Sequence, residues 1–395
     1  MEYNFVIISL SPWNINYGCN IKDMSLELAK HHKVLYIDTP LKRKERWFMK
    51  DQPLVKEAIE RHSAGQSLIK ISENLWHYIP EEVLESVNSL TIDFLFDQLN
   101  YINNSRFARA IQKAVAKVGF DKYILINDND IYNGLHLKKM LSPQRYVYYL
   151  RDKLSSFSYW KRHVTRLEPK LLREADLIVT NSEYLSAYAG EYNKESYYVG
   201  QGCDVEHYLK RPPQEDIDKV LSSIPRPIVG YVGAINAERL DIELLQQMAL
   251  KMPNTSFVLV GAEDEVFKSS SLHDLKNIYF LGKKEISDLP TYIYGFDVCI
   301  NPQRLNEITI GNYPRKIDEY LATGLPVVAT KTHTMNTFRD HVYLAEGVEE
   351  YCASIKLAIT EDSNIKSKNR ISFACTHTWA NNIAEIVSAL DKTKF

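Results

Sequence analysis

Short runs of apolar residues recur along the chain and alternate with segments of helical periodicity. Phe5–Leu10, Val34–Ile37 and Asp176–Thr180 are such runs in the first half, and Ile228–Gly233 and Phe257–Gly261 follow in the second half. Strands that helices cover on both faces have no polar side, so they appear as continuous apolar runs. The alternation of such strands with helices predicts an α/β protein with parallel sheets.

The helical segments each have an apolar face that can cover a sheet. Lys22–His32 follows the first run, and Ser105–Val118 places five apolar residues on one face: Phe107, Ala110, Ile111, Ala114 and Val115. The same periodicity returns in Ile242–Leu250, Val348–Thr360 and Ala380–Leu390. The strand-and-helix pattern therefore begins twice, and 395 residues are enough for two domains.

The boundaries of these domains follow from composition. We place the first domain at residues 1–205 and the second at residues 227–376. Residues 206–226 between them are rich in proline and charged residues, so we expect a linker there. Residues 377–395 are expected to form a terminal helix.

The overall composition argues against several classes of protein. The net charge of −2 gives no global attraction to nucleic acid. The five cysteines are scattered without CxxC or metal-ligand spacing, which predicts free thiols in a reducing compartment and no metal site. Cys299 lies inside an apolar run, so we expect an unreactive core thiol.

The N-terminus lacks the features of a signal peptide. Glu2 stands where a positive flank is expected, and Phe5–Leu10 is too short for the apolar region of such a peptide. No window approaches the roughly 20 apolar residues of a membrane-spanning helix. These features predict a cytoplasmic protein.

One segment has an unusual charge. Thr39–Lys50 contains five basic residues and one acidic residue, so its local charge is five minus one, or +4. Trp47, Phe48 and Met49 add apolar bulk beside that charge. Basic residues next to aromatic ones suit an anionic membrane surface or a lipid-linked acceptor. We therefore expect residues 41–50 to contact the inner face of a membrane peripherally; a solvated loop is the alternative.

The stretch from Asn301 to Thr330 carries the most chemical information. Apolar runs flank it, and Pro314–Ala322 has the spacing of a short helix. Pro314 suits the first turn, and Gly324 can end the helix with a positive φ. A loop and a helix N-terminus after a parallel strand favour a phosphate-bearing ligand, because free N–H groups and the helix dipole both attract anions.

Charged residues lie on this helix at informative positions. Arg315 and Lys316 occupy its first turn, where the dipole opposes positive charge unless an anion is bound. Glu319 follows Lys316 by three residues, so both side chains point to the same side. Lys316 for phosphate and Glu319 for sugar hydroxyls would suit a nucleotide sugar. A surface ion pair between the two residues is the alternative.

The sequence PRKIDEYLATGLPVVAT resembles the donor-site signature of the retaining family 4 glycosyltransferases, most closely the branch of bacterial polysaccharide and teichuronic-acid-type transferases. The matching positions are Pro314, Lys316, Glu319, Tyr320, Leu321, Ala322, Gly324, Pro326, Val327 and Val328. The resemblance implies the GT-B arrangement, an α/β fold of two Rossmann-like doubly wound domains facing across a cleft. It makes residues 1–205 the acceptor side and 227–376 the donor side, and it implies that 377–395 cross back to the first domain.

The resemblance also implies roles for residues of the donor side. Glu319 would hold the ribose hydroxyls. Many members have a sugar-facing Glu where this chain has Gly311, and Glu307 is a candidate substitute. The full set of implied donor-binding residues is Gly233, Arg239, Gly282, Glu307, Lys316 and Glu319.

On the acceptor side, the loop after the first apolar run and carboxylates at strand ends are the candidates. Acceptor or phosphate contacts are expected from Tyr17, Gly18 and Asp128. The catalytic candidates are Asp152, Arg239 and Lys316. Asp128 and Asp152 could instead cap helices or bind loop backbone, and Gly18 could simply be a turn glycine.

The resemblance thus predicts a metal-independent glycosyltransferase without a cofactor. It would move a sugar, with retention, from a UDP- or GDP-linked donor to a glycan or lipid-linked acceptor in cell-surface polysaccharide biosynthesis. A sugar-nucleotide 2-epimerase is one alternative, but it needs clustered acids and histidines that the sequence does not clearly contain. A non-catalytic nucleotide-binding partner protein is the other alternative, and Gly311 supports it.

Overall fold

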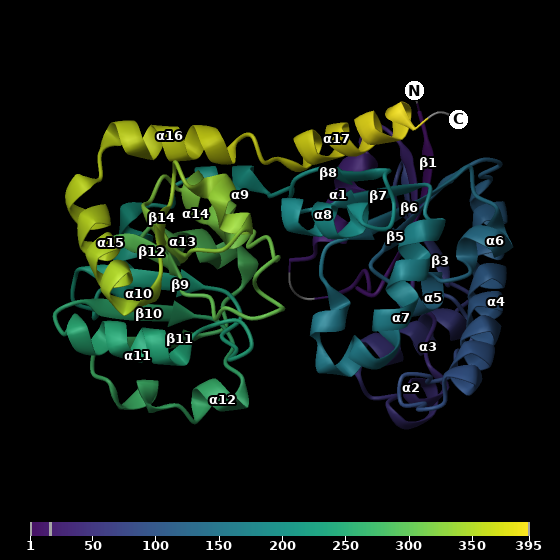
Figure 1. Ribbon diagram of the computed structural model, residues 1–395, viewed down its shortest axis with the longest axis horizontal. Helices are drawn as coiled ribbons and strands as arrows, with labels where there is room; N and C mark the ends of the chain where they lie inside the picture. Colours follow the sequence, from purple (N-terminus) through teal and green to yellow (C-terminus); the bar gives the residue numbers. More distant parts are fainter. Residues whose placement is uncertain (1, 16–17, 394–395) are drawn as a thin grey trace. The chain divides into compact units, whose positions relative to one another are not determined.

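The computed structural model describes residues 2–15 and 18–393, and its contacts divide the chain into two compact units (Figure 1). Unit 1 comprises Met1–Gly200 and Ile383–Phe395, and unit 2 comprises Gln201–Asn382. Each unit contains its own sheet and its own buried core. No helix within residues 2–15 and 18–393 is long and apolar enough to span a bilayer.

Unit 1 is built on an eight-stranded sheet with the order β3-β4-β2-β1-β5-β6-β7-β8. Neighbouring strands are parallel, except that β3 and β4 are antiparallel. The strands are β1 (Asn4–Ser9), β2 (Lys33–Asp38), β3 (Leu68–Ser72), β4 (Leu75–Tyr78), β5 (Ile124–Asp128), β6 (Arg145–Leu150), β7 (Leu177–Thr180) and β8 (Ser196–Tyr198). The strand order reverses between β1 and β5, so the carboxyl ends of these two strands form a topological switch point.

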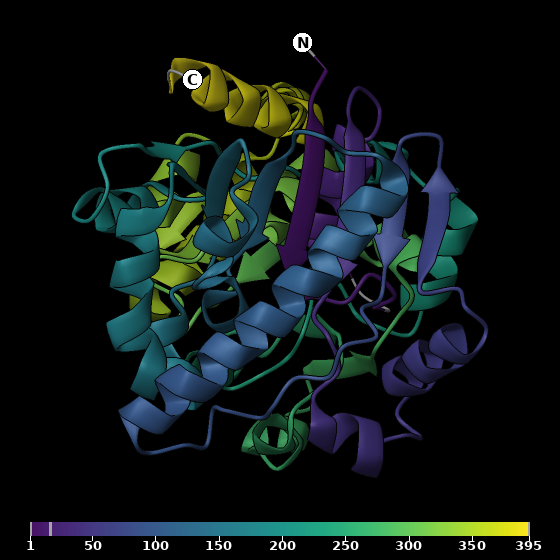
Figure 2. The same cartoon turned by 90° about the vertical axis from the view of Figure 1, so that its right-hand side faces the viewer.

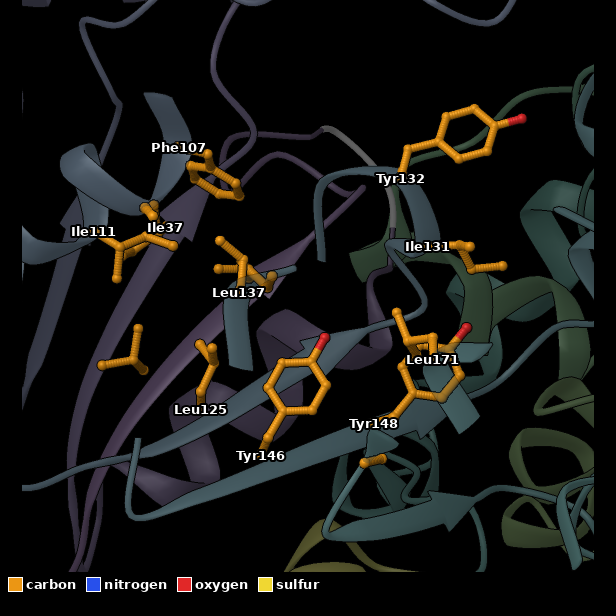
Figure 3. Close-up of a cluster of buried hydrophobic side chains, with 14 of the residues drawn as sticks. Ile37, Phe107, Ile111, Leu125, Ile131, Tyr132, Leu137, Tyr146, Tyr148 and Leu171 are labelled. Atoms are coloured by element: carbon orange, nitrogen blue, oxygen red, sulfur yellow. The ribbon is translucent and has the colours of Figure 1, made fainter. Parts of the chain in front are cut away.

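The helices of unit 1 cover this sheet. They are α1 (Asn20–Leu28), α2 (Arg43–Phe48), α3 (Pro53–Ser63), α4 (Asp93–Val118), α5 (Ile131–Gly134), α6 (Leu137–Leu141), α7 (Ser158–Glu174) and α8 (Glu183–Gly190). Figure 2 shows the long blue helix α4 lying diagonally across the strands. In the core, Phe107 and Ile111 of α4 pack with Ile37 and Leu125 of the sheet (Figure 3).

The apolar face predicted for Ser105–Val118 is confirmed, because its five apolar residues are all buried. The helix is longer than that pattern indicates, since α4 begins at Asp93. Its first turns expose Phe94, Leu95 and Ile102, so no one-sided apolar pattern marks them.

Unit 2 is built on a six-stranded parallel sheet with the order β11-β10-β9-β12-β13-β14. The strands are β9 (Ile228–Val232), β10 (Ser256–Val260), β11 (Ile278–Gly282), β12 (Val298–Asn301), β13 (Val327–Thr330) and β14 (Tyr343–Ala345). Along β12, Val298 and Ile300 join the cluster on one face, whereas Cys299 joins the cluster on the other. Both faces are therefore covered, as the continuous apolar runs predict, and the order reverses between β9 and β12.

The helices of unit 2 include two that sequence composition did not indicate. The full set is α9 (Val205–Leu209), α10 (Gln214–Leu221), α11 (Ile242–Lys251), α12 (Glu265–Lys268), α13 (Leu289–Ile293), α14 (Lys316–Ala322), α15 (Gly347–Glu361), α16 (Asn364–Ala374) and α17 (Trp379–Lys392). The expectation of a linker at 206–226 is wrong, because α9 and α10 form there and Tyr208 and Leu221 are buried in the core of unit 2. Sparse apolar residues at helical spacing anchor this segment despite its prolines and charges. Helix α17 begins in unit 2, and its residues from Ile383 onward belong to unit 1.

The cysteines give a direct test of this packing. All five are free thiols in the described part of the chain; Cys375 is exposed and the other four are buried. Burial raises the pKa of the Cys299 thiol far above its ordinary value. We expect an alkylating reagent to label one thiol of the native protein rapidly, at Cys375, and all five in denaturant. Rapid labelling of native Cys299, located by peptide mass analysis, would contradict the placement of β12 in the core.

Candidate functional site

Three neighbouring strands of unit 2 end in glycine at the same edge of the sheet. Gly233 follows β9, Gly261 follows β10 and Gly282 ends β11. The N–H of Gly233 donates to the carbonyl oxygen of Val260 at 2.9 Å, and the N–H of Gly261 donates to that of Gly282 at 3.0 Å. A Cβ on Gly261 would lie 1.8 Å from the carbonyl oxygen of Gly233, so the two loops approach too closely for any side chain there.

The ammonium group of Lys316 lies directly against Gly233. Its Nζ is 2.5 Å from the hydroxyl of Tyr231, to which it donates, and 4.1 Å from the centroid of that ring. A Cβ on Gly233, whose φ is +140°, would lie only 2.9 Å from Nζ. The glycine after β9 therefore makes room for a cation from the first turn of α14, and the two predicted donor residues meet at one point.

Helix α14 is fixed in this position at both ends. The hydroxyl of Tyr320 accepts from the N–H of Val232 at 2.7 Å and donates to its carbonyl oxygen at 3.2 Å. After the helix, Gly324 has φ +78°, and its carbonyl oxygen accepts from the buried guanidinium of Arg370 at 2.7 Å and 2.9 Å. These contacts hold the first turn of α14 over the carboxyl end of β9 without relying on a ligand.

Glu319 does not pair with Lys316, which was the alternative considered from the sequence; its partner is Arg315. Its Oε1 accepts from Nε of Arg315 at 3.1 Å, whereas Lys316 is directed to Tyr231. The Glu319 side chain is 13% exposed. Burial first, and then the nearby Glu319 carboxylate, raise the pKa of the Cys203 thiol well above its ordinary value, so Glu319 lies near that residue. The Lys316–Glu319 ion pair is therefore wrong, and an i, i+4 pair takes its place.

The loops after β9 and β12 hold each other at the switch point. Leu240 and Gln303 form an antiparallel bridge, and the N–H of Arg304 donates to the carbonyl oxygen of Arg239 at 2.9 Å. The amide of Asn306 donates to the carbonyl oxygen of Glu238 at 2.7 Å. The backbone of Arg239 is thus fixed, and its side chain is partly exposed without an ion-pair partner among the residues that the structure describes.

Two buried amide side chains at this edge have polar atoms without a hydrogen-bond partner among the described residues. Asn301, the last residue of β12, is 1% exposed, and neither Oδ1 nor Nδ2 has a partner in the described structure. Gln303 is 5% exposed and its Oε1 is likewise unpartnered. Buried polar atoms without partners are costly, so they indicate a place for a bound polar group. Sequence reasoning missed both residues, although their position just after an apolar strand could have indicated them.

A third missed residue, Asp318, stabilises the same helix. It is fully buried, and its carboxylate accepts from the hydroxyl of Tyr313 at 2.8 Å and from Nδ1 of His377 at 2.7 Å. Burial raises the pKa of Asp318, and the hydrogen bond from His377 opposes that rise. The pair ties α14 to the segment that precedes α17, which is a structural role.

The remaining donor candidates lie farther along the same edge. Gly282 ends the outer strand β11 with φ +69° and open space beside it. Glu307 is exposed and lies in a turn in which Oδ1 of Asn306 accepts from the N–H groups of Ile308 and Thr309 at 2.8 Å and 3.0 Å. Gly311, in the position of the family's sugar-facing Glu, is buried.

The acceptor-side candidates belong to unit 1, at its own switch point. Asp128 is fully buried at the end of β5, where it accepts from the hydroxyl of Ser9 at 2.6 Å and from the guanidinium of Arg151. Burial opposes the charge of Arg151, but the Asp128 carboxylate outweighs that effect and raises the pKa of the guanidinium. Asp128 is therefore a buried ion-pair partner, so the expected acceptor contact through its carboxylate is not supported by this geometry.

The other acceptor-side candidates are more accessible. Asp152 follows Arg151 at the carboxyl end of β6 and is partly exposed; its carbonyl oxygen accepts from the amide of Asn129 at 3.0 Å. Gly18 is exposed in the loop before α1. Tyr17 lies outside the described residues. Across the described part of the chain, His, Cys, Asp and Glu side chains nowhere gather in a group of three or more that could bind a metal ion.

The two parallel-sheet α/β units and the glycine-lined strand ends define the fold class as GT-B, the two-domain fold of many glycosyltransferases. The structure is similar over 99% of the chain to all of HepE from Anabaena, solved with UDP and glucose (TM-score 0.69, 15% identity). It is also similar over 99% of the chain to all of sucrose-phosphate synthase from Thermosynechococcus elongatus (TM-score 0.71, 16% identity).

Sequence comparison matches part of the second unit to a known family. Residues 226–360 match the family described as "Glycosyl transferases group 1". The chain is 24% identical over 237 residues to TuaH of Bacillus subtilis (strain 168), whose name places it among the glycosyltransferases of teichuronic acid biosynthesis. That match covers 56% of this chain and 58% of the relative, which is less than two thirds of the relative's length. The resemblance of PRKIDEYLATGLPVVAT to glycosyltransferases of this group is confirmed, because the sequence lies within the matched residues.

Proposed function

We propose that this protein is a glycosyltransferase that moves a sugar from a UDP- or GDP-linked donor to a glycan or lipid-linked acceptor in cell-surface polysaccharide biosynthesis. The observation that carries the proposal is the contact of the Lys316 ammonium with Gly233 at the switch point of a group 1 domain. The solved complexes of HepE with UDP and with UDP-glucose support a nucleotide-sugar donor by analogy of fold.

In this proposal, the diphosphate of the donor binds against Gly233, where no side chain blocks the backbone, and Lys316 neutralises its charge. Arg239 supplies a second cation from the loop after β9. Because the Lys316 ammonium is held in place before the donor arrives, it stabilises the charge that develops on the leaving nucleoside diphosphate with little reorganisation. Glu319 binds the ribose hydroxyls, and Asn301 and Gln303 offer buried amides to polar groups of the donor.

Retention of configuration at the anomeric carbon belongs to the same proposal, as does Asp152 as the catalytic residue of unit 1. The bond from the anomeric carbon to the nucleoside diphosphate would break, and the acceptor oxygen would bond to that carbon on the same face, so an α-linked donor would give an α-linked product. Determination of the product anomer by NMR tests this directly, and a β-linked product would show inversion.

A non-catalytic nucleotide-binding protein is the second candidate, because Gly311 replaces the family's sugar-facing Glu. The assay that separates the candidates has two parts. Thermal unfolding is measured with UDP, GDP and their sugars, where a ligand at 100 times its Kd adds about 2.7 kcal/mol. Free UDP or GDP is then measured with and without a lipid-linked glycan fraction.

The proposed transferase predicts stabilisation by one nucleotide and release of that nucleotide only with acceptor. A binding protein would be stabilised but would release nothing, and a 2-epimerase would act on the sugar nucleotide without acceptor. Absence of stabilisation by every nucleotide would overturn the assignment of the donor site.

A further inference from the structure

The helix α2 of unit 1 exposes two large aromatic side chains at its C-terminal end. None of its residues is buried, and Trp47 and Phe48 are 57% and 78% exposed. Apolar side chains scattered singly are ordinary on a surface, but adjoining large ones usually mark a binding surface.

The exposed aromatics continue into a depression beside α4. An open pocket of ≈ 460 Å³ is lined by Trp47 and Phe48 of α2 and by Leu99 and Ile102 of α4. The other lining residues are Arg43, Lys44, Glu85, Ser86 and Arg106. Ile102 is itself 43% exposed. The exposed first turns of α4, which showed no one-sided apolar pattern, thus form a surface together with α2.

Basic residues border this apolar depression. A second pocket of ≈ 410 Å³ shares two residues with the first and is lined by four cations, Arg43, Arg106, Arg109 and Lys113, with Glu82 and Val83. We call the two pockets, together with the neighbouring cations Arg46 and Lys50, the α2–α4 surface. Cationic groups beside apolar side chains give it the chemistry of an amphipathic membrane-binding element.

An ion-pair network links α2 to α4 within the α2–α4 surface. Oε1 of Glu85 accepts from Nη2 of Arg43 at 2.5 Å and from Nη1 of Arg106 at 3.0 Å. The hydrogen bond from Arg43, followed by that from Arg106, lowers the pKa of Glu85 to about 2. The N–H of Arg43 also donates to the carbonyl oxygen of Leu84 at 2.8 Å. The alternative of a solvated loop is wrong about the backbone, since residues 43–48 form the helix α2, whose aromatic end is exposed.

The surplus charge is positive. The carboxylate of Glu85 lies between two guanidinium groups, and that of Glu82 pairs with Lys113. Four more cations on or beside α2 and α4 have no ion-pair partner in the described part of the chain: Lys44, Arg46, Lys50 and Arg109. Unpaired cations around an exposed aromatic pair match a surface of phosphates with apolar chains beneath it.

We propose that the α2–α4 surface docks unit 1 on the anionic surface of a lipid bilayer. Trp47 and Phe48 enter the interface between headgroups and acyl chains, while Lys44, Arg46 and Lys50 contact the lipid phosphates. This inference does not depend on sugar transfer, because it concerns a surface of unit 1 and its test measures only lipid binding.

The test uses the full chain in co-sedimentation with vesicles of phosphatidylcholine alone or mixed with phosphatidylglycerol. We expect binding to the anionic vesicles that weakens as salt increases. Lys44→Ser/Arg46→Ser/Lys50→Ser should reduce this binding roughly 10- to 100-fold, because each charge near the surface contributes to the attraction. Trp47→Ser/Phe48→Ser should reduce it by at least about 10-fold, because burial of these rings is lost.

Matched controls come from unit 2. Lys276→Ser/Lys356→Ser/Lys368→Ser removes three exposed charges, and Leu250→Ser/Ile365→Ser removes two exposed apolar groups; neither should change vesicle binding. If the charge control loses vesicle binding to the same degree, the net charge of the protein accounts for the binding and the proposal is wrong. So would failure of the unaltered protein to bind anionic vesicles.

A competition arm separates a bilayer from a small phosphate ligand or a protein partner. Millimolar glycerol phosphate should leave vesicle binding unchanged, because a single soluble headgroup offers no apolar surface. Complete displacement by glycerol phosphate would indicate a discrete phosphate site in place of a docking surface. The inference would also be wrong if the α2–α4 surface bound a partner protein and the chain did not bind vesicles.

Discussion

Lys316→Met is expected to weaken the binding of UDP or GDP by roughly 10- to 100-fold while leaving nucleoside binding unchanged. Methionine keeps the length and apolar character of the stem that lies against Tyr231, but it removes the ammonium group that lies against Gly233. The difference in affinity between Lys316→Met and the unaltered protein therefore measures the contribution of the positive charge and not that of side-chain packing. Calorimetric titration with nucleoside, nucleoside diphosphate and nucleotide sugar measures it, and Lys331→Met, an exposed lysine of the same unit, is the matched control.

Glu319→Gln is expected to give the complementary pattern. If Glu319 holds ribose, it contributes to every ligand that contains the nucleoside, so all three affinities should fall by about 10-fold or more. Arg315→Gln breaks the same ion pair from the other side and should leave nucleoside affinity unchanged. If both variants lose only about 0.5 kcal/mol of stability and keep their nucleoside affinity, the ion pair accounts for Glu319 and the ribose assignment is wrong.

The stability of unit 1 is expected to depend on pH through one buried carboxyl group. Glu168 of α7 is fully buried; its Oε2 accepts from the hydroxyl of Tyr188 at 2.9 Å, and its Oε1 has no partner in the described structure. Burial raises the pKa of Glu168 to about 7 from an ordinary value of 4.5. The folded protein therefore retains a proton that the unfolded chain releases.

The sign of this effect follows from proton binding. Between pH 4.5 and about 7 the native state holds more protons than the unfolded state, so stability falls as pH rises through this window and stays low above it. A shift of this size corresponds to at most about 3 kcal/mol. Glu168→Gln is neutral at every pH, so it should match the unaltered protein near pH 5 and exceed its stability by up to about 3 kcal/mol at pH 8.

Urea unfolding followed by tryptophan fluorescence can measure this difference. Four of the five tryptophans, Trp13, Trp47, Trp76 and Trp160, belong to unit 1, so the signal reports mainly that unit. Glu73→Gln, an exposed glutamate of the same unit, should show no pH-dependent difference. A Glu168→Gln variant that is equally destabilised at pH 5 and pH 8 would show that the carboxyl is needed for packing and does not carry the titration.

The local patterns of the sequence predict the framework of each unit well. Continuous apolar runs correspond to the buried strands, and the helix predicted at Pro314–Ala322 corresponds to α14 at Lys316–Ala322. These predictions succeed because burial on both faces and a helix start are local properties of the chain. The proximity of Gly233 and Lys316 can also be predicted, because the end of β9 and the start of α14 both lie at the carboxyl edge of the parallel sheet.

Features that depend on distant contacts could not be predicted in this way. The direction of Lys316 is set by Tyr231 and by the missing Cβ of Gly233, neither of which lies near it in sequence. Asp318 can be buried because His377, in the segment between α16 and α17, forms a hydrogen bond with its carboxylate. The start of α4 was missed for the opposite reason, since its apolar residues face outward and so give no sign of a buried side.

The two crossings of the chain between the units have a consequence for biosynthesis. The chain leaves unit 1 after Gly200 and returns at Ile383, so unit 2 is inserted within unit 1. At the base of the insertion the N–H of Cys203 donates to the carbonyl oxygen of His377 at 2.9 Å, which pairs the outgoing and returning segments. A ribosome must therefore synthesise all of unit 2 before it delivers the last helix of unit 1. Unit 2 can therefore reach its native state first. Until α17 is synthesised, unit 1 lacks the contacts that α17 makes with it, among them the hydrogen bond from the Tyr3 hydroxyl to Asp391.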